Sequence, residues 1–119
     1  MANITESLES LMRIDGATAS ALVDSNSGMI LGKVGTGVDL DAAGAGNTEV
    51  VRAKMKTMKS LGLSDNIEDI LISLGKQYHI IRPVAAHEGL FFYLVLDRER
   101  SNLALARMAA KQAESSLSV

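Results

Sequence analysis

Only a few short stretches of the sequence place chemically active residue types at a spacing that chemistry requires. The run Gly32–Gly37 has the glycines and the lysine of a phosphate-binding loop, but valine follows Lys33 where a P-loop needs serine or threonine. Asp24 and Asn26 begin like a calcium loop, yet the twelfth position is Gly35 in place of a bidentate glutamate. We therefore expect neither a nucleotide nor a calcium site, and interpret the Asp24 stretch as a hairpin turn.

The remaining candidates are two histidines and a close pair of aspartates. His79 and His87 lack the spacing of paired metal ligands, and the chain contains no cysteine. We expect His79 to pack within a strand or to make a surface hydrogen bond, and His87 to lie in a turn. Asp39 and Asp41 fall in a segment rich in glycine and alanine, whereas acid–base catalysis needs carboxylates in a fixed geometry. The sequence thus predicts no catalytic residue, no metal and no cofactor, and therefore no enzyme.

The overall composition is that of an ordinary globular domain. Of the 119 residues, 47% are hydrophobic and 22% are charged. The net charge of −2 argues against a nucleic-acid partner, which usually requires a strong basic excess. No apolar run approaches the roughly 20 residues of a membrane span, and the N-terminus lacks the regions of a signal peptide. Because the absence of cysteine also fits a reducing compartment, we expect one cytoplasmic domain over residues 1–119.

Capping and turn signals give the order of elements in the first half of the chain. Asn3 and Glu6 have the spacing of a capping box and predict that a helix begins there. Ala17–Asp24 and Met29–Leu31 are typical of two strands joined by a tight turn. The segment Gly35–Gly46 is rich in glycine and alanine, and we interpret it as a loop.

The second half is predicted to contain a helix, three strands and a final helix. Asn47 is a plausible N-cap for a helix that runs to about Leu61 and ends at Gly62. Because Pro83 cannot donate a ladder hydrogen bond, the end of its strand should face a gap or a bulge. The later elements are expected at Ile70–Leu74, Tyr78–Val84, Leu90–Leu96 and about Ser101–Ser116. Since Leu90–Leu96 is apolar on both faces, it should be the central strand.

Two segments carry more apolar surface than one sheet face would cover. Ile70, Leu71 and Ile72 are apolar on both sides of their strand, which is an aggregation hazard at a sheet edge unless another chain covers it. The predicted second helix also has a broad apolar arc, to which methionines contribute. Methionine usually fills cores, but it is also common on surfaces that adapt to partners. The surplus apolar surface indicates a dimer. The residues of the arc are Val50, Val51, Ala53, Met55, Met58 and Leu61.

The same helix carries a ridge of cations. Arg52, Lys56 and Lys59 are spaced i, i+4 and i+7, so they line one face. The ridge is either a solvated helix face or a docking face for an acidic partner, which its positive field would steer. The residues by themselves leave both interpretations open.

Several of these stretches together resemble the roadblock family. The similar segments are Ile67–Ile72, Gly75–Pro83, Leu94–Asp97, Asn102–Arg107, Ile14–Gly16, Ala21–Asp24 and Gly28–Leu31. The family includes roadblock-type dynein light chains, subunits of lysosomal scaffold complexes and bacterial MglB-like regulators. The resemblance covers nearly the whole chain and implies one roadblock domain of class α+β. This is a profilin-like α-β-β-α-β-β-β-α sandwich, whose five-stranded antiparallel sheet has helices on both faces. Since the chain has no long extension, it resembles a minimal bacterial or archaeal member.

The resemblance also implies partners. Roadblock domains dimerise by pairing their third strands, here Ile70, Leu71 and Ile72. Their second helices also pack together, and the seam here would be Val50, Val51, Met55 and Met58. In the bacterial branch the second-helix face receives a small Ras-like GTPase, and some members accelerate hydrolysis without an arginine finger. Arg52, Lys56 and Lys59 would then bind the GTPase and have no catalytic role. The expected function is a non-catalytic, dimeric adaptor or regulator in signalling.

Two other functions stay open. A small-molecule sensor of the PAS or GAF kind also has five antiparallel strands, and Val23–Ile30 resembles its first hairpin. However, the chain has four aromatic residues, three of them within Leu90–Leu96, which leaves few groups to line a ligand cavity. The other alternative is a light-chain-like structural subunit of a larger complex. The sensor predicts an apolar pocket inside the monomer, whereas the roadblock dimer predicts a filled core and a buried twofold edge.

Overall fold

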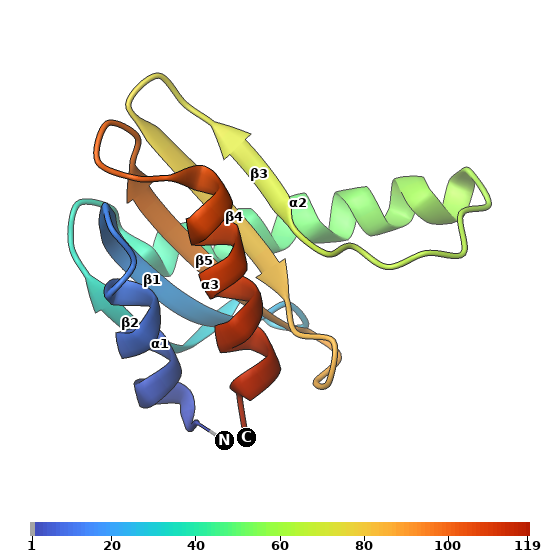
Figure 1. Ribbon diagram of the computed structural model, residues 1–119. Helices are drawn as coiled ribbons and strands as arrows, with labels where there is room; N and C mark the ends of the chain where they lie inside the picture. Colours follow the sequence, from blue (N-terminus) through green and yellow to red (C-terminus); the bar gives the residue numbers. More distant parts are fainter. Residues whose placement is uncertain (1) are drawn as a thin grey trace.

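The computed structural model describes residues 2–119, which form one antiparallel sheet between helices (Figure 1). The element order is the one that the sequence predicts, and the α+β fold class is confirmed. The elements are α1 (Ile4–Met12), β1 (Ala17–Asp24), β2 (Met29–Gly35), α2 (Leu40–Ser60), β3 (Ile70–Ser73), β4 (Gln77–Pro83), β5 (Leu90–Asp97) and α3 (Leu103–Ser116).

The sheet has the strand order β2-β1-β5-β4-β3, with every neighbouring pair antiparallel. As predicted, β5 is central, and all six residues from Phe91 to Leu96 are buried. Helices α1 and α3 cover one face and α2 covers the other (Figure 1). The two core clusters therefore lie on opposite sides of β5, which explains why its side chains are apolar in both directions.

Local signals set most of the boundaries. The capping box at the start of α1 forms: the Asn3 Oδ1 accepts from the Glu6 N–H at 2.8 Å, and the Glu6 carboxylate accepts from the Asn3 N–H at 3.1 Å. Gly28 closes the β1–β2 hairpin and Gly62 follows α2, both with positive φ, a conformation that glycine adopts without strain. The predicted hairpin turn and the C-terminal end of α2 are thus confirmed.

The start of α2 differs from the prediction. The segment from Leu40 to Gly46 is helical, and Asn47 lies inside the helix instead of capping it. The N-cap is Asp39, whose carboxylate accepts from the Ala42 N–H at 3.1 Å. Leu40 is buried in the core, and the helix stays regular through Gly44 because tertiary packing overrides the poor helix propensity of glycine. The loop predicted at Gly35–Gly46 is therefore wrong beyond Asp39.

The two edges of the sheet are built differently. In β2, Leu22 pairs with Gly32 and Val23 with Ile30, so Leu31 is an extra residue that forms a bulge. Bulges interrupt the row of hydrogen-bonding groups and protect an edge from pairing with another chain. The opposite edge strand, β3, pairs with β4 in an unbroken register from Ile70 to Ser73. β3 is therefore the regular edge.

The two ends of the described chain lie side by side. The Ala2 N–H donates to the Ser116 carbonyl at 2.8 Å, and the Ser118 N–H donates to the Ala2 carbonyl at 2.7 Å. Ala2 and Leu117 form an isolated parallel bridge next to α1 and α3. Both ends thus lie on the face of the sheet opposite α2 (Figure 1).

Candidate interaction surface

The edge strand β3 presents unpaired backbone groups. The Leu74 N–H donates to the Gln77 carbonyl at 2.8 Å and marks a hydrogen-bonded pair at the β3–β4 turn. Hydrogen-bonded and non-hydrogen-bonded pairs alternate along an antiparallel ladder. Leu71 and Ser73 consequently point their N–H and C=O groups away from β4, toward the open side. This edge can accept another strand without rearranging the sheet.

Helix α2 projects past this edge. Its 21 residues span about 31 Å, but its buried residues all lie between Leu40 and Val51. From Arg52 to Ser60 every side chain is exposed except Met58, which is half-buried. Figure 1 shows this C-terminal part of α2 extending beyond β3, with the linker Leu61–Asp69 returning to the sheet. A short helical segment with so little packing gains little stability from its own domain.

The residues predicted for a helix seam do not share one environment. Val50 is 37% exposed and Met55 is 57% exposed, so both are free to contact a partner. Met58 is half-buried, whereas Val51 is only 4% exposed and packs into the core under α2. On the sheet, Ile70, Leu71 and Ile72 are each half-buried. Val50 and Met55 are consequently the predicted helix residues with the most surface to offer.

The cationic ridge lies on the projecting part of α2. Arg52, Lys56 and Lys59 are all exposed. None of the three takes part in an ion pair within residues 2–119. Their charges are therefore displayed to solvent on the one part of the helix that the sheet does not cover.

A polar network lies under α2, one strand in from the β3 edge. The His79 Nδ1 and the Tyr93 hydroxyl share a hydrogen bond of 3.0 Å, and the His79 Nε2 bonds the Gln77 side chain at 2.9 Å. Burial lowers the pKa of His79. Burial also raises the pKa of Tyr93, which a hydrogen bond from Asn47 partly offsets. As predicted, His79 packs within its strand, and its two side-chain hydrogen bonds are half-buried. Ile72 of β3 lies beside it in register.

The aspartates and histidines considered for chemistry have structural roles. Asp39 caps α2, and Asp41 forms an exposed ion pair of 2.9 Å with Lys33. His87 lies in the β4–β5 turn, where its carbonyl accepts from the Leu90 N–H. Among residues 2–119, no group of three or more His, Cys, Asp or Glu side chains is arranged to hold a metal ion.

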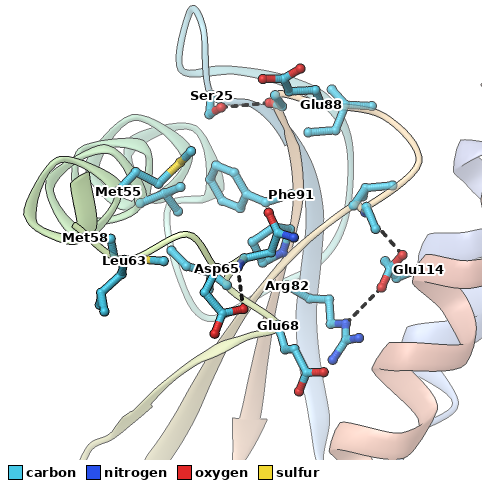
Figure 2. Close-up of a pocket in the computed structure, with 18 of the residues that line it drawn as sticks. Ser25, Met55, Met58, Leu63, Asp65, Glu68, Arg82, Glu88, Phe91 and Glu114 are labelled. Carbon is cyan, nitrogen blue, oxygen red and sulfur yellow. Dashed lines mark hydrogen bonds and ion pairs between the residues drawn. The ribbon is translucent and has the colours of Figure 1, made fainter. Parts of the chain in front are cut away.

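A groove of about 710 Å³ opens beside the end of β4 (Figure 2). Its apolar lining includes Met55 and Met58 of α2, Leu63 of the linker and Phe91 of β5. Figure 2 shows the methionines and Leu63 on one side of the groove and Arg82, paired with Glu114, on the other. This groove was not predicted.

Two ion pairs hold the segments around the groove. The buried Arg82 Nε donates to the Glu114 carboxylate at 3.1 Å, and the same carboxylate accepts from the Ala85 N–H at 3.3 Å. Arg107 of α3 makes two hydrogen bonds of 2.8 Å to Asp69 at the start of β3. Neither pair has a sequence spacing that reveals it, because the partners are 32 and 38 residues apart.

The chain resembles several solved structures in its fold. No family model matches the sequence, and no curated protein matches it. Among solved structures, the gliding protein MglB of Thermus thermophilus superposes with a TM-score of 0.81 and 20% identity, over 93% of this chain and 82% of that one. A Roadblock/LC7 domain from Streptomyces avermitilis gives 0.82 and 14%, over 97% and 94%. An MglB with a tetrameric arrangement gives 0.82 and 20%, over 95% and 83%.

These likenesses extend over nearly the whole chain. In residues 2–119 there is no helix with the length and apolarity needed to cross a membrane. The resemblance to roadblock proteins seen in the sequence is thus confirmed at the level of structure. The chain has the roadblock fold, in the form found in MglB.

Proposed function

We propose that this chain is a non-catalytic adaptor or regulator that forms a homodimer and binds a small Ras-like GTPase on its α2 face. The observation that carries the proposal is the regular, open edge of β3 beside the uncovered half of α2. In the dimer, the β3 strands of two copies pair and continue the sheet from one chain into the other. Signalling then depends on what the α2 face binds.

The choice of edge rests on the contrast between β2 and β3. The bulge at Leu31 disfavours pairing at β2, whereas β3 offers the backbone groups of Leu71 and Ser73 in a regular row. The fold neighbours include an MglB with a tetrameric arrangement, which supports assembly as a property of this fold.

The projecting half of α2 supports the same dimer. The helix extends beyond β3 on one face (Figure 1), so a second sheet joined at that edge would lie beneath the projection. Met55, which is more than half exposed, then gains a surface to pack against, and Val50 lies near the seam. Burying apolar side chains there supplies stability that the lone domain cannot give the helix.

The GTPase proposal depends on the cations that α2 displays. Arg52, Lys56 and Lys59 form an exposed ridge without ion-pair partners in the described chain. An exposed single-sign ridge accelerates encounter with a partner of opposite charge. Arg52 acts in binding, and any acceleration of GTP hydrolysis would come from reshaping the GTPase site.

The first test is the mass of the isolated protein by size-exclusion chromatography with light scattering. We expect twice the mass of one 12.6 kDa chain. A monomer at all accessible concentrations would overturn the homodimer.

The second test reverses the ridge. The triple variant Arg52→Glu, Lys56→Glu and Lys59→Glu should stay dimeric and bind a Ras-like GTPase of the same organism at least about tenfold more weakly. The GTPase is loaded with a non-hydrolysable GTP analogue and titrated by calorimetry at low salt.

A second triple variant controls for net charge. Its three cations are exposed and lie outside α2. They are changed as Arg13→Glu, Arg100→Glu and Lys111→Glu. Equal losses of GTPase affinity in both triple variants would mean that the net charge of the protein, and not the position of the ridge, determines binding. Unchanged affinity in the ridge variant would leave the ridge as a solvated helix face and favour a light-chain-like structural subunit.

The structure gives the small-molecule sensor less support. Its core holds Phe91, Phe92 and Tyr93, each at most 2% exposed, within two filled clusters. The groove beside β4 is open to solvent, and the buried charged groups that line it, Arg82 and Glu114, bond each other, unlike the convergent polar groups of a ligand cavity.

A further inference from the structure

The groove beside β4 exists because the neighbouring strand is short. β3 begins at Ile70, which pairs with Ile81, so the last two residues of β4 have no partner on that side. Pro83 has no N–H to leave unpaired in this gap, as its sequence position predicts. The linker passes the gap without filling it, and Asp65–Glu68 form the far rim. The groove is therefore a consequence of strand register.

The two sides of the groove differ in rigidity. On the sheet side, the Glu114 carboxylate holds Arg82 and Ala85, and Ser25 donates to the Gly89 carbonyl from its N–H at 2.7 Å and its hydroxyl at 2.8 Å. The other side consists of Met55 and Met58 on the projecting helix, together with Leu63. Methionine is flexible and polarizable, so this side can adapt its shape to an apolar side chain.

The rim of the groove is acidic. Asp65 and Glu68 lie along one side and Glu88 lies across from them (Figure 2). All three side chains belong to exposed residues, and none forms an ion pair within the described chain. Arg82 is neutralised by Glu114, which leaves Lys59 as the one other cation among the described residues that line the groove. An apolar floor with a carboxylate rim is complementary to apolar side chains flanked by cations.

We propose that this groove binds a short protein segment that carries one or two large apolar residues between lysines or arginines. The apolar side chains would lie against Met55, Met58 and Leu63, and the flanking cations would face Glu68 and Glu88. The groove shares Lys59 with the cationic ridge, but its acidic rim selects a partner of the opposite charge. One chain thus offers an acidic partner and a basic partner two different surfaces.

A small polar ligand fits the groove less well. The groove volume is within the range of small-molecule sites, but such sites orient a ligand with buried polar groups that point inward. Here the buried polar pair, Arg82 and Glu114, is bonded internally. Strand addition is also disfavoured, because the Val84 N–H donates to the Leu90 carbonyl and the Ala85 N–H donates to Glu114. Of these three modes of binding, the groove best fits recognition of the side chains of an apolar, basic segment.

The test uses a fluorescent hexapeptide with the order lysine, leucine, lysine, lysine, leucine, lysine. The protein is labelled with ¹³C at its methionine methyl groups and titrated with this peptide by NMR. We expect the Met55 and Met58 signals to shift while those of Met12, Met29 and Met108, which do not line the groove, stay unchanged. Shifts spread over all five methyl groups, or none, would overturn the proposal.

Charge variants give a second readout by fluorescence anisotropy. The double variant Glu68→Lys and Glu88→Lys should weaken peptide binding by about tenfold at low salt, and the difference should shrink as salt screens the rim. The matched control is the double variant Glu9→Lys and Glu99→Lys, whose exposed carboxylates lie away from the groove. Equal weakening in both double variants would overturn the assignment of the rim.

The test also separates the peptide from a second copy of the chain. The methionine spectra are recorded on dilution without peptide, alongside light scattering. If Met55 and Met58 shift together on dilution and the peptide then causes no further shift, a second copy occupies the groove and the proposal fails. Light scattering of the same samples reports the oligomeric state independently of the peptide, so failure of the peptide titration is distinguishable from failure of the proposed homodimer.

Discussion

At the scale of single residues, two glycines of α2 show how the space around a position decides whether it can hold a larger side chain. A Cβ on Gly44 would lie 2.6 Å from the Ile30 Cδ1 and 3.3 Å from its Cγ1, so the helix lies directly on β2. A Cβ on Gly46, one half-turn further on, would meet nothing within 4 Å. The two glycines have the same propensity but opposite surroundings.

This contrast predicts opposite effects on stability. Gly46→Ala should stabilise the fold by about 0.5–1 kcal/mol, because alanine loses less backbone entropy in a helix. Gly44→Val should destabilise it by about 1–3 kcal/mol through overpacking against Ile30. Urea denaturation measures both changes in the free energy of unfolding. If Gly46→Ala gave no gain, the helical assignment of Leu40–Gly46 would be contradicted.

His79 predicts a pH dependence. Burial lowers its pKa in the folded state below the ordinary 6.5, so the unfolded chain binds the proton first. Its contribution to stability is therefore present above pH 6.5 and is lost as the pH falls from 6.5 through the folded-state pKa. His79→Gln should flatten this part of the curve of unfolding free energy against pH, whereas His87→Gln, in the β4–β5 turn, should retain it. A curve unaffected by His79→Gln would exclude this role.

At the scale of elements, β3 combines a regular edge with one exposed side chain that can be changed without loss of packing. Ser73 is exposed, and the ladder alternation turns its N–H away from β4. Proline at this position removes the outward donor and keeps the bonds between β3 and β4. The preceding Ile72 is already extended, as a residue before proline prefers.

Ser73→Pro should therefore weaken the proposed homodimer while the monomer stays folded. The loss occurs once in each chain, so we expect about 2 kcal/mol, or roughly a thirtyfold higher dissociation constant. Sedimentation velocity measures the constant, and Ser73→Thr, which keeps the N–H, is the control. Dimers of equal affinity in both variants would exclude pairing through this edge.

The sequence predicted these elements unevenly. Asn3 and Gly62 act locally, so the start of α1 and the end of α2 could be located closely from residue type and spacing. The first turns of α2 were missed because the reason for Gly44 lies in Ile30, a contact between separate elements. The edge position of β3 was implied by the resemblance to roadblock domains. The groove was not, since it depends on β3 starting opposite Ile81.

At the scale of the whole molecule, the two faces of the sheet differ in how completely helices cover them. α1 and α3 complete the core on one face, whereas α2 leaves part of the other face and its own C-terminal half uncovered. In the proposed homodimer, the uncovered face and the open edge couple folding to association. The stability of such a chain depends on its concentration.

The midpoint of thermal unfolding should consequently rise by several degrees over about two decades of protein concentration. Differential scanning calorimetry measures it, and Ser73→Pro should show a smaller dependence. A midpoint independent of concentration for the unchanged chain would mean that the monomer accounts for all of the measured stability.

The bridge between Ala2 and Leu117 has a practical and evolutionary consequence. Because both ends meet on the face opposite α2, a short peptide can join them, and the chain can be reopened at a surface turn as a circular permutant. The same geometry lets this fold be inserted into a loop of a host protein, since entry and exit lie side by side. Such an insert would keep α2 and β3 facing outward, so the surfaces proposed for partner binding would stay accessible in the host.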